Sequence, residues 1–342
     1  MEKLRIVVPV YNDWPSFRIL LRELDQVAAR LPCRVFVTAV DDGSTAVPDQ
    51  TYNSFVDIQH LAGAEILHLA GNVGHQRAIA IGLCVAVTDG DFDAVIVMDA
   101  DGEDPPQMIE HLLRSIGQQT DFCIVARRRK RTETVLFKLS YLVYKTIFKL
   151  TTGKTVNFGN FSLLSHGYAR RLVLVSDLWN NLPAAILRSR LPVTSVPVDR
   201  GRRYEGASKM NFTSLVVHGL SGISVYADTI FIRLLLLTIF LFFFGSVSVA
   251  TVLTLRLFFP AHATPGWATT VTFGLAIILL QVFFTALSSI LMLLHSRVQR
   301  LVTPILDFKP YLDHRQLLFG QPFSVTVKLP EWEKALIAGP IS

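Results

Sequence analysis

Acidic side chains follow an apolar run near the middle of the chain. Residues 94–98 predict a buried strand, and the chain continues as Asp-Ala-Asp-Gly-Glu-Asp-Pro-Pro at residues 99–106. If the extended conformation persists, Asp99 and Asp101 share one face and Glu103 comes next in register. Clustered carboxylates suit hard divalent cations, which commonly share them with substrate phosphates. The sequence therefore predicts a Mg²⁺ or Mn²⁺ site at Asp99, Asp101 and Glu103.

A second acidic group follows an earlier apolar run. Residues 35–40 predict a strand, which Asp41-Asp42-Gly43-Ser44-Thr45 follow. Adjacent carboxylates at a strand end can accept hydrogen bonds from a nucleobase and a ribose hydroxyl, and Gly43 permits a sharp turn. The same residues also make a good turn that binds nothing, so both interpretations stay open.

Two basic clusters supply the opposite charge. Residues 127–131 are Arg-Arg-Arg-Lys-Arg and follow a predicted strand at residues 122–126. Arg200, Arg202, Arg203 and Lys209 form the second cluster. A run of cations most often faces solvent or lipid headgroups. We therefore assign only Arg127 of the first cluster to the site, because it directly follows the strand.

Alternating strands and helices must position these residues. Residues 5–10, 35–40, 94–98 and 122–126 are short apolar runs, and residues 16–29 and 77–87 are amphipathic. This alternation predicts an α/β domain with a mostly parallel sheet, in which ligands bind beyond the carboxyl ends of the strands. Asp104-Pro105 predicts the N-cap and first position of a further helix.

Composition places part of the chain in a membrane. Hydrophobic residues make up 51% of the 342 residues, and the mean hydropathy of +0.41 is too high for an ordinary cytosolic enzyme. Residues 234–255 and 267–294 carry no charged side chain, and each is long enough to span a bilayer. Two buried core helices are the alternative. Arg297, Arg300, Lys309 and Arg315 follow the second stretch and predict that both ends are cytosolic.

The expected division has four parts. Residues 1–210 form the α/β domain, 211–229 a juxtamembrane amphipathic segment, 230–295 a two-helix transmembrane hairpin and 296–342 a cytosolic tail. Residues 136–150 and 211–226 predict helices that either lie on the membrane surface or cover the sheet. Residues 316–329 predict a hairpin that could mediate self-association, and the N-terminus predicts no signal peptide. With three cysteines, a disulfide framework is not expected.

Four motifs, in this order and ahead of two apolar spans, resemble the family-2 glycosyltransferases of the polyprenyl-phosphate type, such as dolichol-phosphate mannose synthases. The motifs are Pro-Val-Tyr-Asn at residues 9–12, Asp-Asp-Gly-Ser-Thr at 41–45, the acidic run at 99–106, and Arg-Tyr-Glu-Gly-Ala-Ser-Lys at 203–209. The resemblance covers residues 4–295. It implies a GT-A fold and transfer of one sugar, with inversion, from a nucleotide sugar to a polyprenyl phosphate at the cytosolic membrane face.

The resemblance also implies partners and roles. It favours a UDP-sugar donor, Mg²⁺ or Mn²⁺, a bacterial plasma membrane and cell-envelope glycan synthesis, with no nucleic acid involved. The implied nucleotide-sugar contacts are Pro9, Tyr11, Asn12, Asp42, His75, Asp99 and Asp101. The implied catalytic residues are Asp101, Asn160, Arg127, Arg203 and Lys209, of which Arg127, Arg203 and Lys209 would contact the donor diphosphate or the acceptor phosphate.

The chain departs from the family pattern at three positions. Relatives carry Gly-Asp-Phe-Arg where this chain has Gly-Asn-Phe-Ser at residues 159–162, Lys at the position of His75, and commonly Gln at that of Glu103. Asn160 cannot act as a base. A phosphate monoester has a second pKa of about 6 and is largely a dianion at neutral pH, so a phosphate acceptor needs no strong base. We therefore expect Asn160 to orient the acceptor phosphate or a sugar hydroxyl.

Two other functions remain open. One is a glycosyltransferase that acts on another membrane lipid, although a hydroxyl nucleophile would need the base that Asn160 cannot supply. The other is a non-catalytic membrane protein that binds a nucleotide sugar. The chain lacks a Gln-x-x-Arg-Trp motif and has two spans, which argues against a processive polysaccharide synthase.

Overall fold

The computed structural model describes residues 1–46, 57–90, 92–128, 146, 153, 158–205, 224–258, 266–298 and 302–320. The chain divides into two compact units. The sheet unit comprises Met1–Thr134, Val156–Val225 and Val302–Ser342, and the helical unit comprises Val135–Thr155 and Tyr226–Leu301. Two segments far apart in the sequence, before and after the helical unit, therefore fold together.

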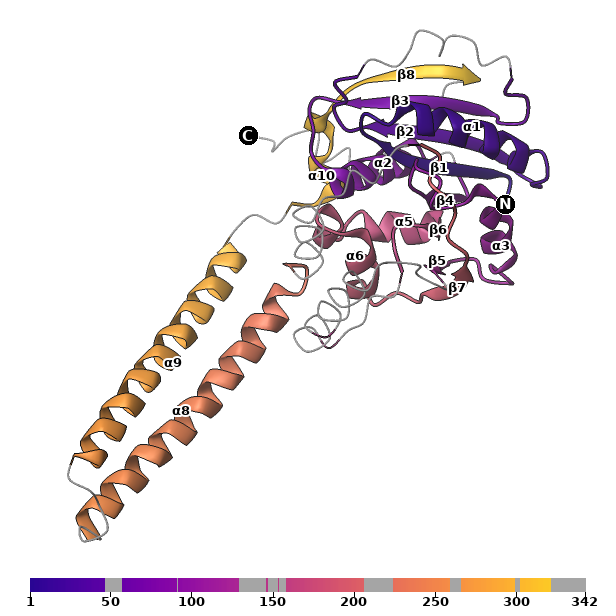
Figure 1. Ribbon diagram of the computed structural model, residues 1–342. Helices are drawn as coiled ribbons and strands as arrows, with labels where there is room; N and C mark the ends of the chain where they lie inside the picture. The colour runs from indigo at the N-terminus through magenta and orange to yellow at the C-terminus, as the bar shows by residue number, and fades with distance from the viewer. Residues whose placement is uncertain are drawn as a thin grey trace, which may run out of the picture. The chain divides into compact units, whose positions relative to one another are not determined.

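The described part of the sheet unit is built on one eight-stranded sheet in the order β7-β5-β6-β4-β1-β2-β3-β8 (Figure 1). The strands are β1 (Lys3–Val10), β2 (Arg34–Asp41), β3 (Gly63–Leu69), β4 (Ala94–Val97), β5 (Cys123–Arg128), β6 (Ser162–Ser165), β7 (Thr194–Val198) and β8 (Leu312–Gly320). Only β6 and β8 pair antiparallel to their neighbours. The carboxyl ends of the other strands and the start of β6 therefore lie at the same edge.

Helices cover both faces of this sheet. The helices and 3-10 turns are α1 (Trp14–Ala28), α2 (His75–Asp89), η2 (Pro106–Met108), α3 (Ile109–Arg114), α5 (His166–Leu172), η3 (Ser176–Trp179), α6 (Leu182–Arg188), α10 (Pro304–Asp307) and η5 (Lys309–Tyr311). Leu4 and Ile6 of β1 join the apolar core under α1 and α3, whereas Val7 joins the core under α2, α5 and α6. This alternation along β1 is the period of two that a strand buried on both faces requires.

The predicted α/β fold with a mostly parallel sheet is confirmed. All four strands expected from apolar runs are present, with ends shifted by up to two residues. The strands β3, β6 and β7 were not predicted, and β8 was predicted only in part, as the first arm of the hairpin at residues 316–329. Cys84 and Cys123 lie in the core, and the three cysteines are free thiols.

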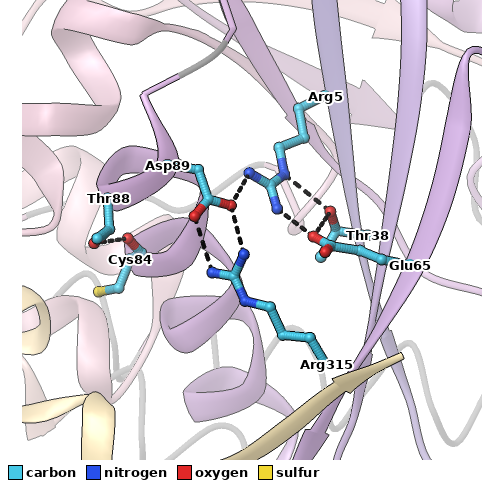
Figure 2. Close-up of polar contacts among 7 residues, drawn as sticks. All are labelled: Arg5, Thr38, Glu65, Cys84, Thr88, Asp89 and Arg315. Atoms are coloured by element: carbon cyan, nitrogen blue, oxygen red, sulfur yellow. Dashed lines mark hydrogen bonds and ion pairs between the residues drawn. The ribbon is translucent and has the colours of Figure 1, made fainter. Parts of the chain in front are cut away.

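Strand β8 lies at one edge of the sheet, beside β3 (Figure 1). Residues 316–320 therefore pair with β3, whereas residues 321–329 of the predicted hairpin lie outside the described residues. An ion network, buried except at Arg315, attaches the strand (Figure 2). Arg315 of β8 donates to both oxygens of Asp89, at 2.9 and 3.1 Å, and Asp89 also accepts from Arg5 at 2.7 Å.

Arg5 completes this network within the sheet. Its remaining donors reach Glu65 of β3 at 2.5 Å and Thr38 of β2 at 2.9 Å. Two arginines thus meet two carboxylates, which is the balance that burial of charge demands. The network joins β1, β2, β3 and α2 to a strand that follows the helical unit in sequence.

The helical unit contains two long apolar helices, α8 (Ala227–Phe258) and α9 (Trp267–Val298). Both are long and apolar enough to cross a membrane, with mean hydropathies of 2.5 and 2.4. They approach closely at Gly245, where a side chain would overlap Leu279. Large apolar side chains such as Phe243, Leu257 and Phe273 are exposed, so these helices are not the buried core helices of a soluble domain. Residues 136–150, apart from residue 146, and residues 211–223 lie outside the described residues.

Candidate active site

Loops that follow three strands meet at the carboxyl edge of the sheet. Arg203, beyond β7, lies 3.2 Å from the carboxylate of Asp101, beyond β4, and 3.8 Å from that of Asp13, beyond β1. The parallel order of these strands dictates this meeting, because their carboxyl ends share one edge. The predicted convergence of Asp101 and Arg203 is therefore found in the structure.

The loop after β4 turns instead of staying extended. Backbone N–H of Glu103 donates to Asp101 Oδ1 at 3.0 Å, and Gly102 adopts φ +86°. Glu103 consequently leaves the expected register and pairs with Arg200 at 2.5 Å. The Asp104 N-cap prediction is wrong, because this carboxylate accepts the N–H of Asp99 at 3.1 Å and the next helical turn begins at Pro106.

Residues 200–204 run against this acidic loop as a strap. The N–H of Gly201 donates to the carbonyl of Glu103 at 3.0 Å, and the N–H of Tyr204 donates to that of Asp101 at 2.9 Å. A side chain at Gly102 would collide with the backbone of the strap, so this position requires glycine. The strap fixes two arginines, Arg200 and Arg203, beside two acidic side chains.

Asp99 faces a different set of partners. His75 Nε2, in the first turn of α2, lies 3.3 Å from Asp99 Oδ1, and Asn160 Nδ2, just before β6, lies 3.5 Å from the same oxygen. Asn160 Nδ2 is also 3.0 Å from His75 Nε2. Asp99, His75 and Asn160 are thus brought together from three elements, as the motif comparison predicts.

Electrostatics at this edge favour a bound cation. Burial raises the pKa of Asp101, and the nearby Asp99 and Glu103 carboxylates raise it further, while Arg203 opposes them. Desolvation lowers the pKa of His75, but Asp99 and, to a smaller extent, Asp42 and Asp101 outweigh it, so the pKa lies above its usual value. The contributions of neighbouring carboxylates to both shifts reflect negative charge that an added cation would relieve.

The donor set fits a divalent cation that also binds a ligand. No group of three or more His, Cys, Asp or Glu side chains within the described residues forms a ready metal site. Mg²⁺ usually takes only one or two protein carboxylates and completes its shell with water and phosphate oxygens. Asp101 and Glu103, on one short loop, would supply such ligands, and Asp99 lies on the same loop.

The residues near β1 and β2 that were predicted to contact the nucleotide sugar do not all face the site. Asp42 is 3% exposed, and its carboxylate accepts the N–H groups of Val73 and Gly74 at 2.7 and 3.0 Å. Burial raises its pKa, against these hydrogen bonds. Asp42 therefore holds the loop that leads into α2, the helix that carries His75. Both oxygens of its carboxylate already accept backbone hydrogen bonds.

Asn12 and Tyr11 occupy the turn after β1. Asn12, at φ +51°, accepts the N–H groups of Thr45 and Ala46, both at 2.9 Å, and so ties this turn to the one after β2. Tyr11 is 46% exposed at this edge, free to stack on a flat ligand. Pro9 is buried inside β1 opposite Val40 and is not brought to the surface of the site.

The other two basic residues that were predicted for the site are Arg127 and Lys209. Arg127 lies within β5 instead of after it, because the strand runs two residues longer than predicted, and its side chain is exposed. Across the described ranges, no hydrogen bond or ion pair joins Arg127 to the acidic loop. Lys209 lies outside the described residues.

Sequence reasoning missed three contributors to the site. Asp13 and Arg200 have the charges expected at a strand end, and Arg200 was noted only as part of a basic cluster. Gln76 donates to Asn160 Oδ1 at 3.0 Å and has no local signal, because it reads as an ordinary position in the first turn of α2.

Comparison with known proteins matches the sequence to a family. The profile described as glycosyl transferase family 2 matches residues 5–175, half of the chain. An uncharacterised glycosyltransferase from Synechocystis is 28% identical over 224 residues, covering 65% of this chain and 68% of the relative. The undecaprenyl-phosphate 4-deoxy-4-formamido-L-arabinose transferase of Klebsiella pneumoniae is 25% identical over 225 residues, covering 63% of this chain and 65% of the relative.

The solved structures that match the chain are more distant in sequence. Glucosyl-3-phosphoglycerate synthase from Mycobacterium tuberculosis, crystallised with Mn²⁺, UDP-glucose and phosphoglyceric acid, has a TM-score of 0.47 and 11% identity, covering 67% of this chain and 80% of that one. Mannosyl-3-phosphoglycerate synthase from Rubrobacter xylanophilus has the same TM-score with 16% identity, covering 66% and 73%.

The profile match spans β1 to α5 and includes the acidic loop and Asn160, and the sheet has the GT-A arrangement that the sequence predicted. The chain therefore belongs to glycosyl transferase family 2 and is a glycosyltransferase that uses a nucleotide sugar.

Proposed function

We propose that the chain transfers one sugar from a UDP-sugar to a polyprenyl phosphate at the cytosolic face of a bacterial plasma membrane, with inversion and with Mg²⁺ or Mn²⁺. The observation that carries this proposal is the presence, in one chain, of the acidic edge and of two exposed apolar helices. The edge would hold the donor diphosphate through a cation, and the helices would keep the protein at the membrane that contains the acceptor. The name of the Klebsiella pneumoniae relative, which specifies undecaprenyl phosphate, supports the same acceptor class.

The covalent step is a direct displacement. An oxygen of the acceptor phosphate attacks the anomeric carbon, the bond from that carbon to the donor diphosphate breaks, and the nucleoside diphosphate leaves with the bonding electrons. Because the phosphate is already largely ionised near neutral pH, no side chain has to remove a proton. Asn160 in place of an aspartate is compatible with this chemistry.

Side chains at the carboxyl edge hold the reactants in place and neutralise their charge. Arg203 has a buried Nε with no hydrogen-bond partner among the described residues, so it has a donor left for a diphosphate oxygen. Asp101 and Glu103 would hold the divalent cation, which neutralises the leaving diphosphate. Tyr11 is exposed where a nucleobase could stack, and Asn160 offers its amide to the acceptor phosphate.

The fold supports placing the whole sheet unit on one side of the membrane. The chain leaves this unit before α8 and returns to it at α10 and β8, so α8 and α9 would cross the bilayer in opposite directions. Arg297, Arg300 and Lys309, close to the end of α9, favour the cytosolic side. Arg315 is excluded from this argument because it is paired with Asp89.

Transfer by the purified protein in detergent tests the proposal. Labelled uridine and guanosine nucleotide sugars would be offered with a polyprenyl phosphate and Mg²⁺, Mn²⁺ or a chelator. We expect lipid-extractable label from one UDP-sugar, abolished by the chelator and by Asp101→Ala. Nucleotide binding without transfer to any lipid phosphate would contradict the proposed acceptor and favour another lipid or a binding function.

A further inference from the structure

Gln76 connects a fixed backbone group to Asn160. It lies in the first turn of α2 and is 9% exposed. The N–H of Leu182 donates to Gln76 Oε1 at 2.8 Å, and Gln76 Nε2 donates to Asn160 Oδ1 at 3.0 Å. The chain therefore contains a relay of two hydrogen bonds that ends at the site.

The direction of this relay follows from its first member. A peptide N–H can only donate, so Gln76 must turn its carbonyl oxygen toward Leu182. Its amide nitrogen then faces Asn160, and Asn160 must accept with Oδ1. This leaves Asn160 Nδ2 on the other side, 3.0 Å from His75 Nε2 and 3.5 Å from Asp99 Oδ1.

The anchor of the relay is rigid. Leu182 is fully buried at the start of α6, and the preceding Asn181 caps that helix by accepting the N–H of Ala184 at 3.0 Å. Reversing the Asn160 amide would place its NH₂ against the NH₂ of Gln76, and reversing Gln76 would place its NH₂ against the N–H of Leu182. Each reversal sets two donors against each other at the buried Gln76, which is costly.

We propose that Gln76 is a positioning residue that fixes Asn160 as a hydrogen-bond donor toward the reacting groups. Position 160 therefore offers an N–H to an anionic oxygen, in place of the acceptor that a carboxylate would present. Under the proposed function, on which this step rests, that oxygen belongs to the acceptor phosphate. Gln76 itself contacts Asn160 and the backbone, not the substrate.

Two substitutions at Gln76 test the role by kinetics. Gln76→Met removes the relay without adding charge, and Gln76→Glu keeps an acceptor for Leu182 but presents an acceptor to Asn160, which must then reverse. For both we expect the KM for polyprenyl phosphate to rise roughly 10-fold to 100-fold, as for loss of a hydrogen bond to a charged group. The Kd of the UDP-sugar should change less than about twofold, since Gln76 acts only through Asn160.

Double variants separate positioning from a general structural role. In an Asn160→Ala background, Gln76→Met and Gln76→Glu should cause no further loss, because the group they position is gone. Equal losses with and without Asn160 would overturn the inference, as would wild-type kinetics in Gln76→Met. The control is Gln107→Met, a substitution of an exposed glutamine whose amide contacts Glu23, and it should leave both constants unchanged.

A spectroscopic measurement tests the relay without any activity. In protein labelled with ¹⁵N-glutamine, the side-chain amide signal of Gln76, assigned by its loss in Gln76→Met, should shift in Asn160→Ala and exchange slowly with water. An unshifted signal would overturn the inference even if transfer is observed. If wild-type protein shows no transfer but the signal shifts, the proposed function fails and the relay stands.

Discussion

Two charged clusters of this chain use the same residue types in opposite ways. In the buried network, Arg5 and Asp89 have side chains 1% and 2% exposed, and their contacts with each other, Glu65 and Arg315 measure 2.5–3.1 Å. At the carboxyl edge, Asp99 and Asp101 are 28% and 18% exposed, and Arg203 approaches its two partners only to 3.2 and 3.8 Å.

The difference lies in balance as well as in burial. The network sets two arginines against two carboxylates and uses both oxygens of Asp89. At the edge, the carboxylates of Asp13, Asp99, Asp101 and Glu103 exceed the charge of Arg200 and Arg203. A balanced network strongly penalises the loss of a buried member such as Arg5 or Asp89, whereas a partly exposed, unbalanced cluster can exchange its contacts for a ligand. The first arrangement suits attachment of β8, and the second suits catalysis.

The sharpest test of this contrast removes one charge from the network. Asp89→Asn leaves Arg5 and Arg315 facing each other with only Glu65 to neutralise them. Loss of one partner from a buried ion pair costs about 3–5 kcal/mol, and we expect the apparent Tm in detergent to fall by roughly 6–20 °C. Activity per folded molecule should persist at low temperature.

A surface ion pair serves as the control for this variant. Arg22 and Asp57 are 2.9 Å apart but largely exposed, so Arg22→Met should leave the Tm nearly unchanged. Equal shifts in Asp89→Asn and Arg22→Met would contradict the structural role of the buried network.

At the carboxyl edge we expect a substitution to reduce activity and to leave stability intact. Asp101→Ala should reduce transfer by at least roughly 100-fold, or about 2.7 kcal/mol, because it removes a ligand for the cation and leaves the leaving diphosphate less neutralised. The Tm should stay the same or rise, since the substitution relieves repulsion from Asp99 and Glu103. Addition of a chelator to wild-type protein should reproduce the loss of transfer. Retained activity in Asp101→Ala would remove this residue from the site.

A milder change within the network should act locally on β8. Arg315→Gln removes one cation but leaves Asp89 paired with Arg5, so we expect a cost of about 1–3 kcal/mol. Hydrogen exchange measured by mass spectrometry should speed up in residues 312–320 and in β3, while β1 and β4 stay protected. Uniform acceleration across the sheet would show that β8 is not a separate unit of stability.

These clusters also show where reasoning from sequence succeeds and fails. Asp99 and Asp101 were found because they follow a predicted strand of a parallel sheet, a rule that needs only local patterns, whereas Arg203 was assigned from the family resemblance alone. Strand β3 was missed because Glu65 and His68 interrupt its apolar residues. Glu65 can be buried because Arg5 and Thr38 donate hydrogen bonds to its carboxylate. Strand β8 pairs with β3 across more than two hundred residues; the predicted hairpin covered its residues 316–320, but nothing local indicated β3 as its partner.

The roles of single residues were harder to predict than their location. Asp42 was expected at the nucleoside, but its carboxylate is tied to two backbone amides, which only the return of the loop before α2 makes available. Gln76 gains a role solely from Leu182, on a helix a hundred residues later. Motifs thus locate a site, whereas tertiary contacts decide which atom each side chain presents.

A substitution at Asn160 discriminates between acceptor chemistries. In Asn160→Asp, Gln76 would donate to one carboxylate oxygen and the other would face Asp99, which increases the negative charge of the edge. A phosphate acceptor would then be repelled, lose the Asn160 N–H and gain nothing from a base, so transfer at low acceptor concentration should fall by about 10-fold to 100-fold, as expected for Gln76→Met. The loss should persist as the pH is raised above 7, because the acceptor phosphate is already a dianion there. A hydroxyl acceptor would behave oppositely, since a new carboxylate could take its proton. Steady-state transfer to polyprenyl phosphate between pH 6 and 8, compared with the uncharged Asn160→Gln, separates these outcomes, and a rate above wild type in Asn160→Asp would contradict the phosphate acceptor.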